Sequence, residues 1–302
     1  MSDERNISWT QRCRFEFIEW KLYWEGALNR SDLETAFGIS TPQASVDLRR
    51  YREKATDNIA YDATERFFRP TRNFEPRYFE PSADRLLLQK RAYLSGATDR
   101  ASLRFRELPE MDMAPDIVRH VEPSCLRSII AAMRDRTCLE VEYQSLTKSS
   151  RRLIAPHALA FDGHRWHARA WACDKDDFRD FVLTRMGRVE SGPRADFDPE
   201  DDLEWTRKID LELRPHPGLT VEQAAAIRCD YAMEAGKRTV EVRLSMALYF
   251  ISRMNLDLND LPPTRAQIEL ANLDEVRTAV EEARAESKRR IIARRTSDTE
   301  PG

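Results

Sequence analysis

A run of three predicted strands over residues 153–186 constrains the fold of this chain more than any other feature. The first two strands flank Asp162-Gly163, a dipeptide typical of the tight turn of a β-hairpin. Side chains alternate across a strand, so basic residues and small or apolar residues are expected on opposite faces of the second strand. The expected basic face carries Arg165, His167 and Arg169. The sequence therefore predicts an antiparallel sheet with one cationic face.

A cationic sheet face suits an anionic ligand, because the planar fork of a guanidinium group pairs bidentately with phosphate or carboxylate. Arg185, at the end of the third strand, adds a further basic group. The alternative is that these residues are solvated side chains of a half-exposed sheet. Strict alternation of three basic residues beside Trp166 and Trp171 favours the ligand interpretation.

The segments GHRWHARA (163–170) and FRDFVLTRM (178–186) resemble the WYL domain of bacterial transcription regulators. Trp166 stands at the Trp of the motif, while His167 and Ala168 replace its Tyr and Leu. This form, with His after Trp, is similar to the BrxR and CapW regulators of phage-defence operons. The resemblance implies an Sm-like β-barrel that binds a nucleotide or nucleic-acid signal. The ligand contacts that we expect are Tyr143, Ser145, His157, Arg165, His167, Arg169 and Arg185. Core packing of Tyr143 remains an alternative.

Residues 29–51 predict a helix-turn-helix. A short helix capped at Asn29 or Ser31 ends at Gly38, which suits the left-handed position after a helix. Ser40 is expected to cap the second helix, which in this motif lies in the major groove of DNA. The expected DNA contacts are Ser40, Thr41, Gln43, Ala44 and Ser45 near base edges, and Arg49 and Arg50 at phosphates.

Residues 59–70 predict two short strands, placed where the wing of a winged helix would follow. Arg66 and Arg69 are expected to contact backbone phosphates there. The alternative for the whole N-terminal region is a helical hairpin with a solvated basic face. The WYL resemblance favours DNA binding, because such regulators commonly carry an N-terminal winged helix.

The fold class predicted is α+β, with four parts. The expected divisions are a winged helix-turn-helix domain (1–80), a helical linker (81–122), a WYL ligand-sensing domain (123–195) and a C-terminal extension (196–302). The acidic run 196–202 is interpreted as a boundary. The β-α-β-α pattern beyond it predicts a small α/β module with an antiparallel or mixed sheet. The resemblance implies that this module serves dimerisation.

Composition excludes several classes of protein. The net charge of −3 over 302 residues means that DNA binding must come from local patches. We find no apolar segment approaching the roughly 18 residues of a membrane span and no signal-peptide core, so we expect a cytoplasmic protein without membrane partners. Five scattered cysteines and five histidines predict reduced thiols and no metal site. A phosphate-binding glycine loop and a nucleophile elbow are both missing, so we expect neither a cofactor nor an enzyme.

These features predict a homodimeric, ligand-responsive repressor that binds operator DNA carrying an inverted repeat. The resemblance implies that it autoregulates a phage-defence operon of the BREX or CBASS-like kind and leaves the operator when a nucleotide or oligonucleotide effector binds. Two alternatives remain open. One is an activator whose DNA affinity rises with the signal, and the other is an RNA- or single-strand-binding accessory protein.

Overall fold

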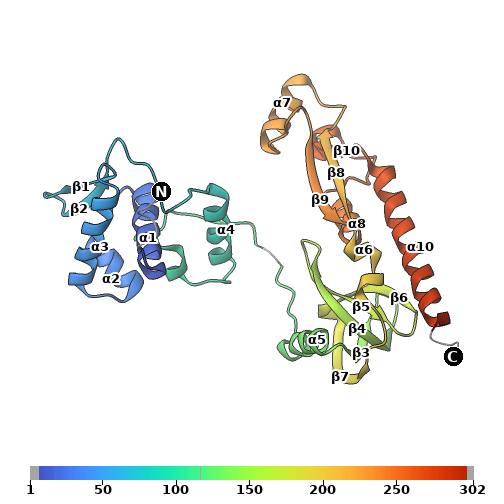
Figure 1. Cartoon of the computed structure of the whole chain (residues 1–302). Coiled ribbons are helices and arrows are strands. Elements are labelled where there is room, and N and C mark those ends of the chain that lie inside the picture. Colours follow the sequence, from blue (N-terminus) through green and yellow to red (C-terminus); the bar gives the residue numbers. More distant parts are fainter. Residues whose placement is uncertain (1–6, 116, 298–302) are drawn as a thin grey trace. The chain divides into compact units, whose positions relative to one another are not determined.

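The computed structural model describes residues 7–115 and 117–297, and the chain divides into two compact units, 1–117 and 118–302 (Figure 1). The first unit consists of α1 (Trp9–Glu25), α2 (Arg30–Phe37), α3 (Thr41–Lys54), β1 (Ile59–Asp62), β2 (Phe67–Pro70), α4 (Ala83–Leu94) and the 3₁₀ helix η2 (Arg100–Leu103). β1 and β2 form an antiparallel hairpin, and a further antiparallel bridge joins Leu28 to Phe68. The predicted helix-turn-helix and wing are thereby confirmed as structural elements.

Local capping explains where the two helices of the helix-turn-helix begin and end. Asn29 caps α2 through a capping box, in which its side chain accepts from the backbone N–H of Asp32 and the Asp32 carboxylate accepts from that of Asn29. Gly38 ends α2 with a φ of 61°, a left-handed conformation that glycine adopts without steric cost. Ser40 then caps α3, as the sequence predicts.

A buried carboxylate fixes the segment that follows the wing. Glu19 of α1 is fully buried and accepts hydrogen bonds from the backbone N–H groups of residues 77–79 and from the hydroxyl of Tyr51. Phe74 and Tyr78 pack against the same core. The segment after the wing is therefore held against the core, and Glu19 contributes an anchor that helical periodicity alone does not indicate.

The first part of the second unit is an antiparallel sheet with one covering helix. Its elements are α5 (Pro123–Asp135), β3 (Thr137–Gln144), β4 (Ser149–Phe161), β5 (Trp166–Ala172), β6 (Asp177–Val182), η3 (Leu183–Arg185) and β7 (Met186–Arg194). The strand order is β6-β5-β4-β3-β7, and the predicted hairpin is confirmed with Phe161 opposite Trp166. Among the described residues no pairing joins β6 to β7. The sheet is thus open, and the Sm-like barrel implied by the resemblance is not seen.

The two faces of this sheet pack against different partners. Ala168, Ala170 and Ala172 of β5 lie in a core with Ile129 of α5. Trp171, on the opposite face, packs in a second cluster with Ile291 of the C-terminal helix. The alternation predicted for β5 is therefore confirmed, but both of its faces are buried.

The remainder of the second unit is the predicted α/β module. It contains η4 (Pro199–Asp201), α6 (Leu203–Thr206), β8 (Lys208–Pro215), α7 (Val221–Asp230), β9 (Arg238–Arg243), α8 (Leu244–Arg253), α9 (Pro263–Ala266), β10 (Ile268–Leu270) and α10 (Leu273–Ser297). The sheet order β10-β8-β9 is antiparallel throughout. α10 packs along α6, α8 and β8, as Figure 1 shows. The strand β10 and the short helix α6 are additions to the sequence-based description.

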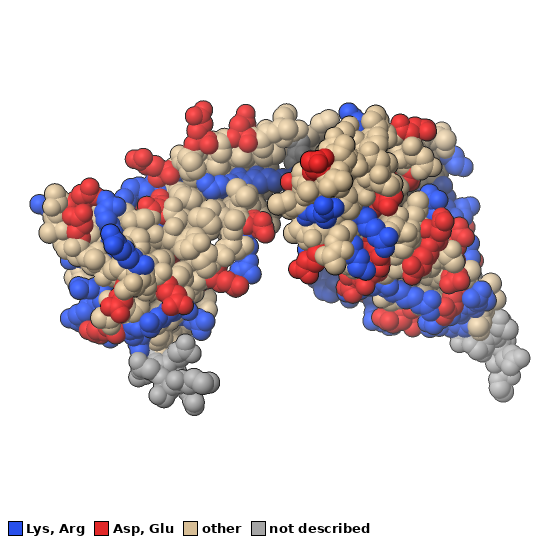
Figure 2. All heavy atoms as spheres, turned by 90° about the horizontal axis from the view of Figure 1, so that it is seen from above, with Lys and Arg blue, Asp and Glu red and all other residues tan. Residues whose placement is uncertain are grey.

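Acidic and basic residues are interspersed over the face of the molecule drawn in Figure 2. This mixture agrees with the small net charge of −3. A DNA-binding surface must therefore be sought on particular elements.

Candidate DNA-binding and ligand-sensing sites

Helix α3, the second helix of the helix-turn-helix, combines exposed side chains with an inner side that is buried in the core. Thr41, Arg49 and Arg50 are exposed, whereas Leu48 and Tyr51 anchor the inner side of the helix in the core. The helical period turns Arg49 and Arg50 away from the core side of α3, while Thr41 is exposed because it is the first residue of the helix.

Three predicted DNA contacts on and beside α3 have local partners. The hydroxyl of Ser40 accepts from the backbone N–H of Gln43, and that of Ser45 donates to the backbone carbonyl of Thr41. The side-chain amide of Gln43 donates to the buried carboxylate of Asp47, which is paired with Arg14 of α1. Thr41, Arg49 and Arg50 are exposed to solvent, while the hydrogen bond to Asp47 fixes the orientation of the Gln43 side chain.

The prediction that Ala44 contacts DNA is wrong. Ala44 is 0% exposed and lies in the core with Leu33 and Leu48. A small residue at this position permits close packing of α3, because a larger side chain would meet the neighbouring helix.

The wing carries both of its predicted phosphate contacts on the surface. Arg66 is exposed at the hairpin turn with a φ of 60°. Arg69 is exposed as well, but its guanidinium pairs with the carboxylates of Glu65 and Asp62. Arg69 would therefore have to exchange these partners for a phosphate group.

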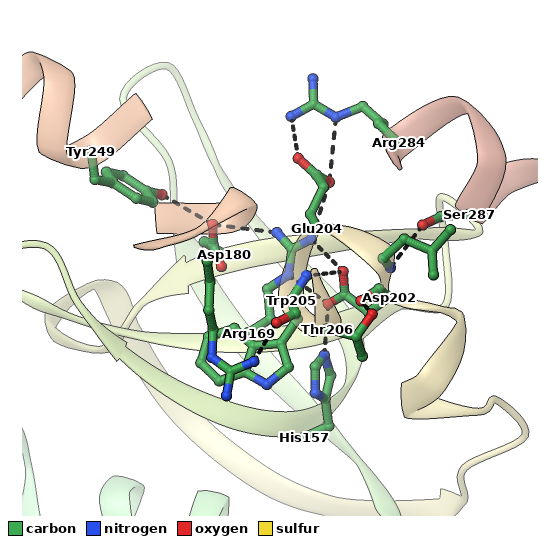
Figure 3. Close-up of polar contacts among 12 residues, drawn as sticks. His157, Arg169, Asp180, Asp202, Glu204, Trp205, Thr206, Tyr249, Arg284 and Ser287 are labelled. Carbon is green, nitrogen blue, oxygen red and sulfur yellow. Dashed lines mark hydrogen bonds and ion pairs between the residues drawn. The ribbon is translucent and has the colours of Figure 1, made fainter. Parts of the chain in front are cut away.

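Arg169 lies at the centre of a buried ionic network between the β3–β7 sheet and the α/β module (Figure 3). Its Nε and Nη2 donate to Asp202 at 2.7 Å and 2.8 Å, and Nη2 also donates to Glu204 at 3.1 Å. Asp180 of β6 is 3.4 Å from Nη1. Arg169 is only 3% exposed. It is therefore not open to a ligand here, because internal carboxylates already occupy its donors.

The pKa values of two carboxyl groups in this network, Asp202 and Asp180, are shifted in opposite directions. Burial raises the pKa of Asp202, but hydrogen bonds from Arg169 and His157 outweigh it, so the pKa lies below its usual value. Burial dominates at Asp180, whose pKa is raised although Arg169 and His167 partly oppose the shift. Asp202 is therefore the firmly ionised partner of Arg169.

Both histidines of the predicted site donate to carboxylates. Because Asp202 is ionised, it can only accept, so Nε2–H of His157 donates to it at 3.0 Å. His167 makes the same contact with Asp162 at 2.9 Å. Burial disfavours the charge of Asp162, but the hydrogen bonds from His167 and from two backbone N–H groups lower its pKa to about 2.

The other predicted ligand contacts are dispersed. The Tyr143 hydroxyl accepts from the backbone N–H of Val182, and its ring packs on the α5 side of the sheet, opposite to Arg169. The hydroxyl of Ser145 is bonded within its own turn. Arg165 pairs with Asp162 at 3.3 Å. Arg185 is half-buried and pairs with none of the described residues.

The predicted set therefore does not share one concavity. Tyr143 packs on the same side of the sheet as Ala168 and Ala170, and Arg169 lies on the opposite face of β5. The prediction that they surround a single ligand is wrong for this structure, because Tyr143 packs in the core on the α5 side while carboxylates on the other side of the sheet enclose Arg169.

Sequence analysis did not identify the acidic partners of the basic strand. Asp202 ends the run interpreted as a domain boundary and Glu204 follows it in α6, yet both are buried. Charge complementarity between this run and the Arg/His strand is a signal that could have indicated the pairing. In addition, Arg284 of α10 pairs with Glu204 at 2.8 Å, which ties the network to the last helix.

The described residues contain no group of three or more His, Cys, Asp or Glu side chains arranged to hold a metal ion. Within residues 7–115 and 117–297, no helix has the length and apolar character needed to cross a membrane.

A winged helix-turn-helix followed by a WYL-like sheet and a small α/β module defines the class of WYL-domain transcription regulators. Family models agree with this class over three segments. Residues 10–92 match the BrxR transcriptional regulator winged helix-turn-helix domain, residues 124–191 match the WYL domain, and residues 208–276 match the BrxR transcriptional regulator C-terminal dimerization domain.

Similar curated proteins extend over nearly the whole chain. The DNA-binding transcriptional repressor CapW of Pseudomonas aeruginosa is 35% identical over 90% of this chain and 93% of its own length. CapW of Escherichia coli (strain KTE188) is 35% identical over 89% and 91%, and CapW of Stenotrophomonas maltophilia 34% over 94% and 96%. The chain therefore belongs to the BrxR/CapW family of WYL-domain transcription regulators.

Among solved structures, the chain aligns with proteasome accessory factor B/C of Arthrobacter aurescens at 14% identity and a TM-score of 0.28. The alignment covers 90% of this chain but only 46% of that protein, so the chain spans less than half of its length.

Proposed function

We propose that this protein is a DNA-binding transcriptional repressor that acts as a homodimer on an inverted-repeat operator. The observation that carries the proposal is the exposed surface of α3, where Thr41 at the first position and Arg49 and Arg50 further along extend from a helix whose inner side is packed in the core. In a winged helix this helix enters the major groove. The relatives' name supports repression, and the match to a dimerization domain supports the homodimer.

The regulated operon is proposed to be the protein's own, within a phage-defence locus. Release from the operator is proposed to follow binding of a nucleotide or nucleic-acid effector at the WYL domain. Linkage supplies the mechanism, since an effector that favours one arrangement of the dimer and DNA that favours another must weaken each other's binding.

Gel-shift titration of the full chain with a duplex of its own upstream region tests the DNA-binding part. Arg49→Ala and Arg50→Ala are expected to weaken binding and to lower the slope of log affinity against log salt by about one for each phosphate group that the variant no longer binds. Arg179→Ala is the matched control, because Arg179 is an exposed arginine of β6, outside the winged helix. If both α3 variants bind like the control, α3 does not lie on the DNA.

Short oligonucleotides and cyclic nucleotides added to the same titration test the regulatory part. Weaker promoter binding supports an effector-released repressor. Stronger binding would instead indicate an activator. A protein that binds single strands or RNA as tightly as it binds the duplex palindrome would be an accessory nucleic-acid-binding protein, and the proposal would fail.

A further inference from the structure

A cavity of about 430 Å³ lies in the second unit, where the end of α5 and the ends of β3 and β7 meet residues 195–199. Its volume is within the range of small-molecule sites in proteins. Polar groups line part of its wall, and Met133, Pro156 and Phe197 line the rest. Of the residues predicted from sequence to contact an effector, only His157 lines this cavity.

Two arginines in the wall are held side by side by the backbone. Thr137 of β3 pairs with Arg194 of β7, and the N–H of Ala195 donates to the carbonyl of Arg136 at 3.0 Å. The guanidinium groups of Arg136 and Arg194 form no ion pair or side-chain hydrogen bond with any described residue, although the charge of Arg136 is near enough to Asp198 to help lower the pKa of that carboxyl. Their position is thus set by the ladder, while their donors remain available to an anion.

The backbone at Arg136 adds a second indication. Arg136 ends α5 with a φ of 52°, a left-handed conformation in which glycine is the favoured residue. An arginine there costs conformational energy that glycine would not, so its side chain is expected to have a use.

We propose that this cavity binds a phosphorylated aromatic ligand, either a free nucleotide or the 5′-phosphorylated end of a single-stranded nucleic acid. Arg136 and Arg194 would hold the phosphate, because two guanidinium groups match its oxygens. Phe197 also lines the cavity; its ring stacks on Trp171, with 6.4 Å between the ring centroids, and a base would contact the part of the ring that faces the cavity. The carboxylate of Asp196 also lines the cavity and opposes the phosphate charge.

His157 connects the cavity to the network around Arg169. Its Nε2–H donates to Asp202, which accepts twice from Arg169 and is followed in α6 by Glu204, the partner of Arg284 in α10 (Figure 3). A ligand that displaces the His157 ring therefore changes the contacts between the sheet and the dimerisation module. The role of this cavity as the effector site rests on the function proposed above, and Arg169 is then a positioning residue.

Isothermal titration of the full chain tests the site. The probes are the four ribonucleoside monophosphates, a 5′-phosphorylated thymidine dinucleotide, the same dinucleotide without phosphate, and inorganic phosphate. We expect at least one phosphorylated nucleoside probe to bind, and binding of the dinucleotide over the monophosphates would identify a nucleic-acid end as the source. The unphosphorylated dinucleotide and inorganic phosphate are each expected to bind at least ten-fold more weakly.

Substitution of the basic and of the acidic lining residues is expected to change probe affinity in opposite directions. Arg136→Gly, which removes the strain of the left-handed backbone, and Arg194→Ala are each expected to weaken the binding of phosphorylated probes at least ten-fold. Asp196→Asn is expected to tighten their binding. Arg134→Ala is the matched control, since Arg134 is an α5 arginine that pairs with Asp135 and does not line this cavity. Its affinity is expected to stay within two-fold of the wild type.

The site assignment is overturned if no phosphorylated probe binds at millimolar concentration, or if Arg136→Gly and Arg194→Ala leave binding unchanged. Equal affinity for inorganic phosphate would overturn the nucleotide class. Promoter binding in the gel shift separates the two proposals. Operator binding without probe binding refutes the cavity alone, and probe binding without operator binding refutes the proposed repressor.

Discussion

Replacement of Arg169 by methionine is expected to destabilise the second unit strongly. The change leaves Asp202 and Glu204 buried without the cation that donates three hydrogen bonds to them, at 2.7 Å, 2.8 Å and 3.1 Å. Removing one partner of a buried ion pair typically costs about 3–5 kcal/mol, because the remaining charge stays desolvated. Arg284 compensates Glu204 from the half-exposed side, so the lower part of this range applies.

Hydrogen exchange at the backbone amides of β5 and α6 measures this cost, because it follows the second unit separately from the first. Arg165→Ala is the control: its side chain is 37% exposed and forms one ion pair at 3.3 Å, so about 0–1 kcal/mol is expected. In a background of Asp202→Asn and Glu204→Gln, the cost of Arg169→Met should shrink, as a double-mutant cycle reveals. If Arg169→Met in the otherwise native chain costs no more than the control, the network is solvated and the reasoning is refuted.

Three further predictions concern buried carboxylates. The lowered pKa of Asp162, about 2, means that its charge stabilises the fold above its unfolded pKa of about 4 and ceases to do so as pH falls through the folded value. Asp162→Asn should therefore lower the urea midpoint at neutral pH and differ less from the wild type in acid; a pH-independent difference would contradict this. Burial raises the pKa of Asp180, so its charge opposes folding at neutral pH. Asp180→Asn should leave the urea midpoint unchanged or higher, and a clear decrease would show that the pair with Arg169 outweighs burial. Glu19→Ala, which removes the acceptor of three backbone N–H groups, should cost about 3 kcal/mol by hydrogen exchange at residues 77–79, and unchanged protection would refute the anchoring role.

The exposure of Trp166, which packs against Phe161, differs from the burial expected for a tryptophan on the apolar face of β5. Their rings lie 5.1 Å apart at the end of the β4–β5 hairpin, and each is about half exposed. Alternation predicts Trp166 on the apolar face of β5, whereas the chain places it at the first position of the strand, beyond the core. Position along the strand, as well as face, thus decides burial.

Local signals in the sequence determined the elements and their order. Asn29, Gly38 and Ser40 specify the ends of the helix-turn-helix through contacts within a few residues. Asp162-Gly163 specifies the hairpin in the same way, and strand alternation separates Arg169 from Ala168. These features depend on residues that are near one another in the chain, so they can be predicted from the sequence.

Only the tertiary structure decided which groups meet. Arg169 and Asp202 are 33 residues apart, and Arg136 and Arg194 are neighbours only because β3 pairs with β7. The acidic run that resembles a linker supplies buried partners for the basic strand, and the open sheet places Tyr143 on the other face. Long-range pairing depends on strand order and on which module covers each face, and a short motif carries no information about either.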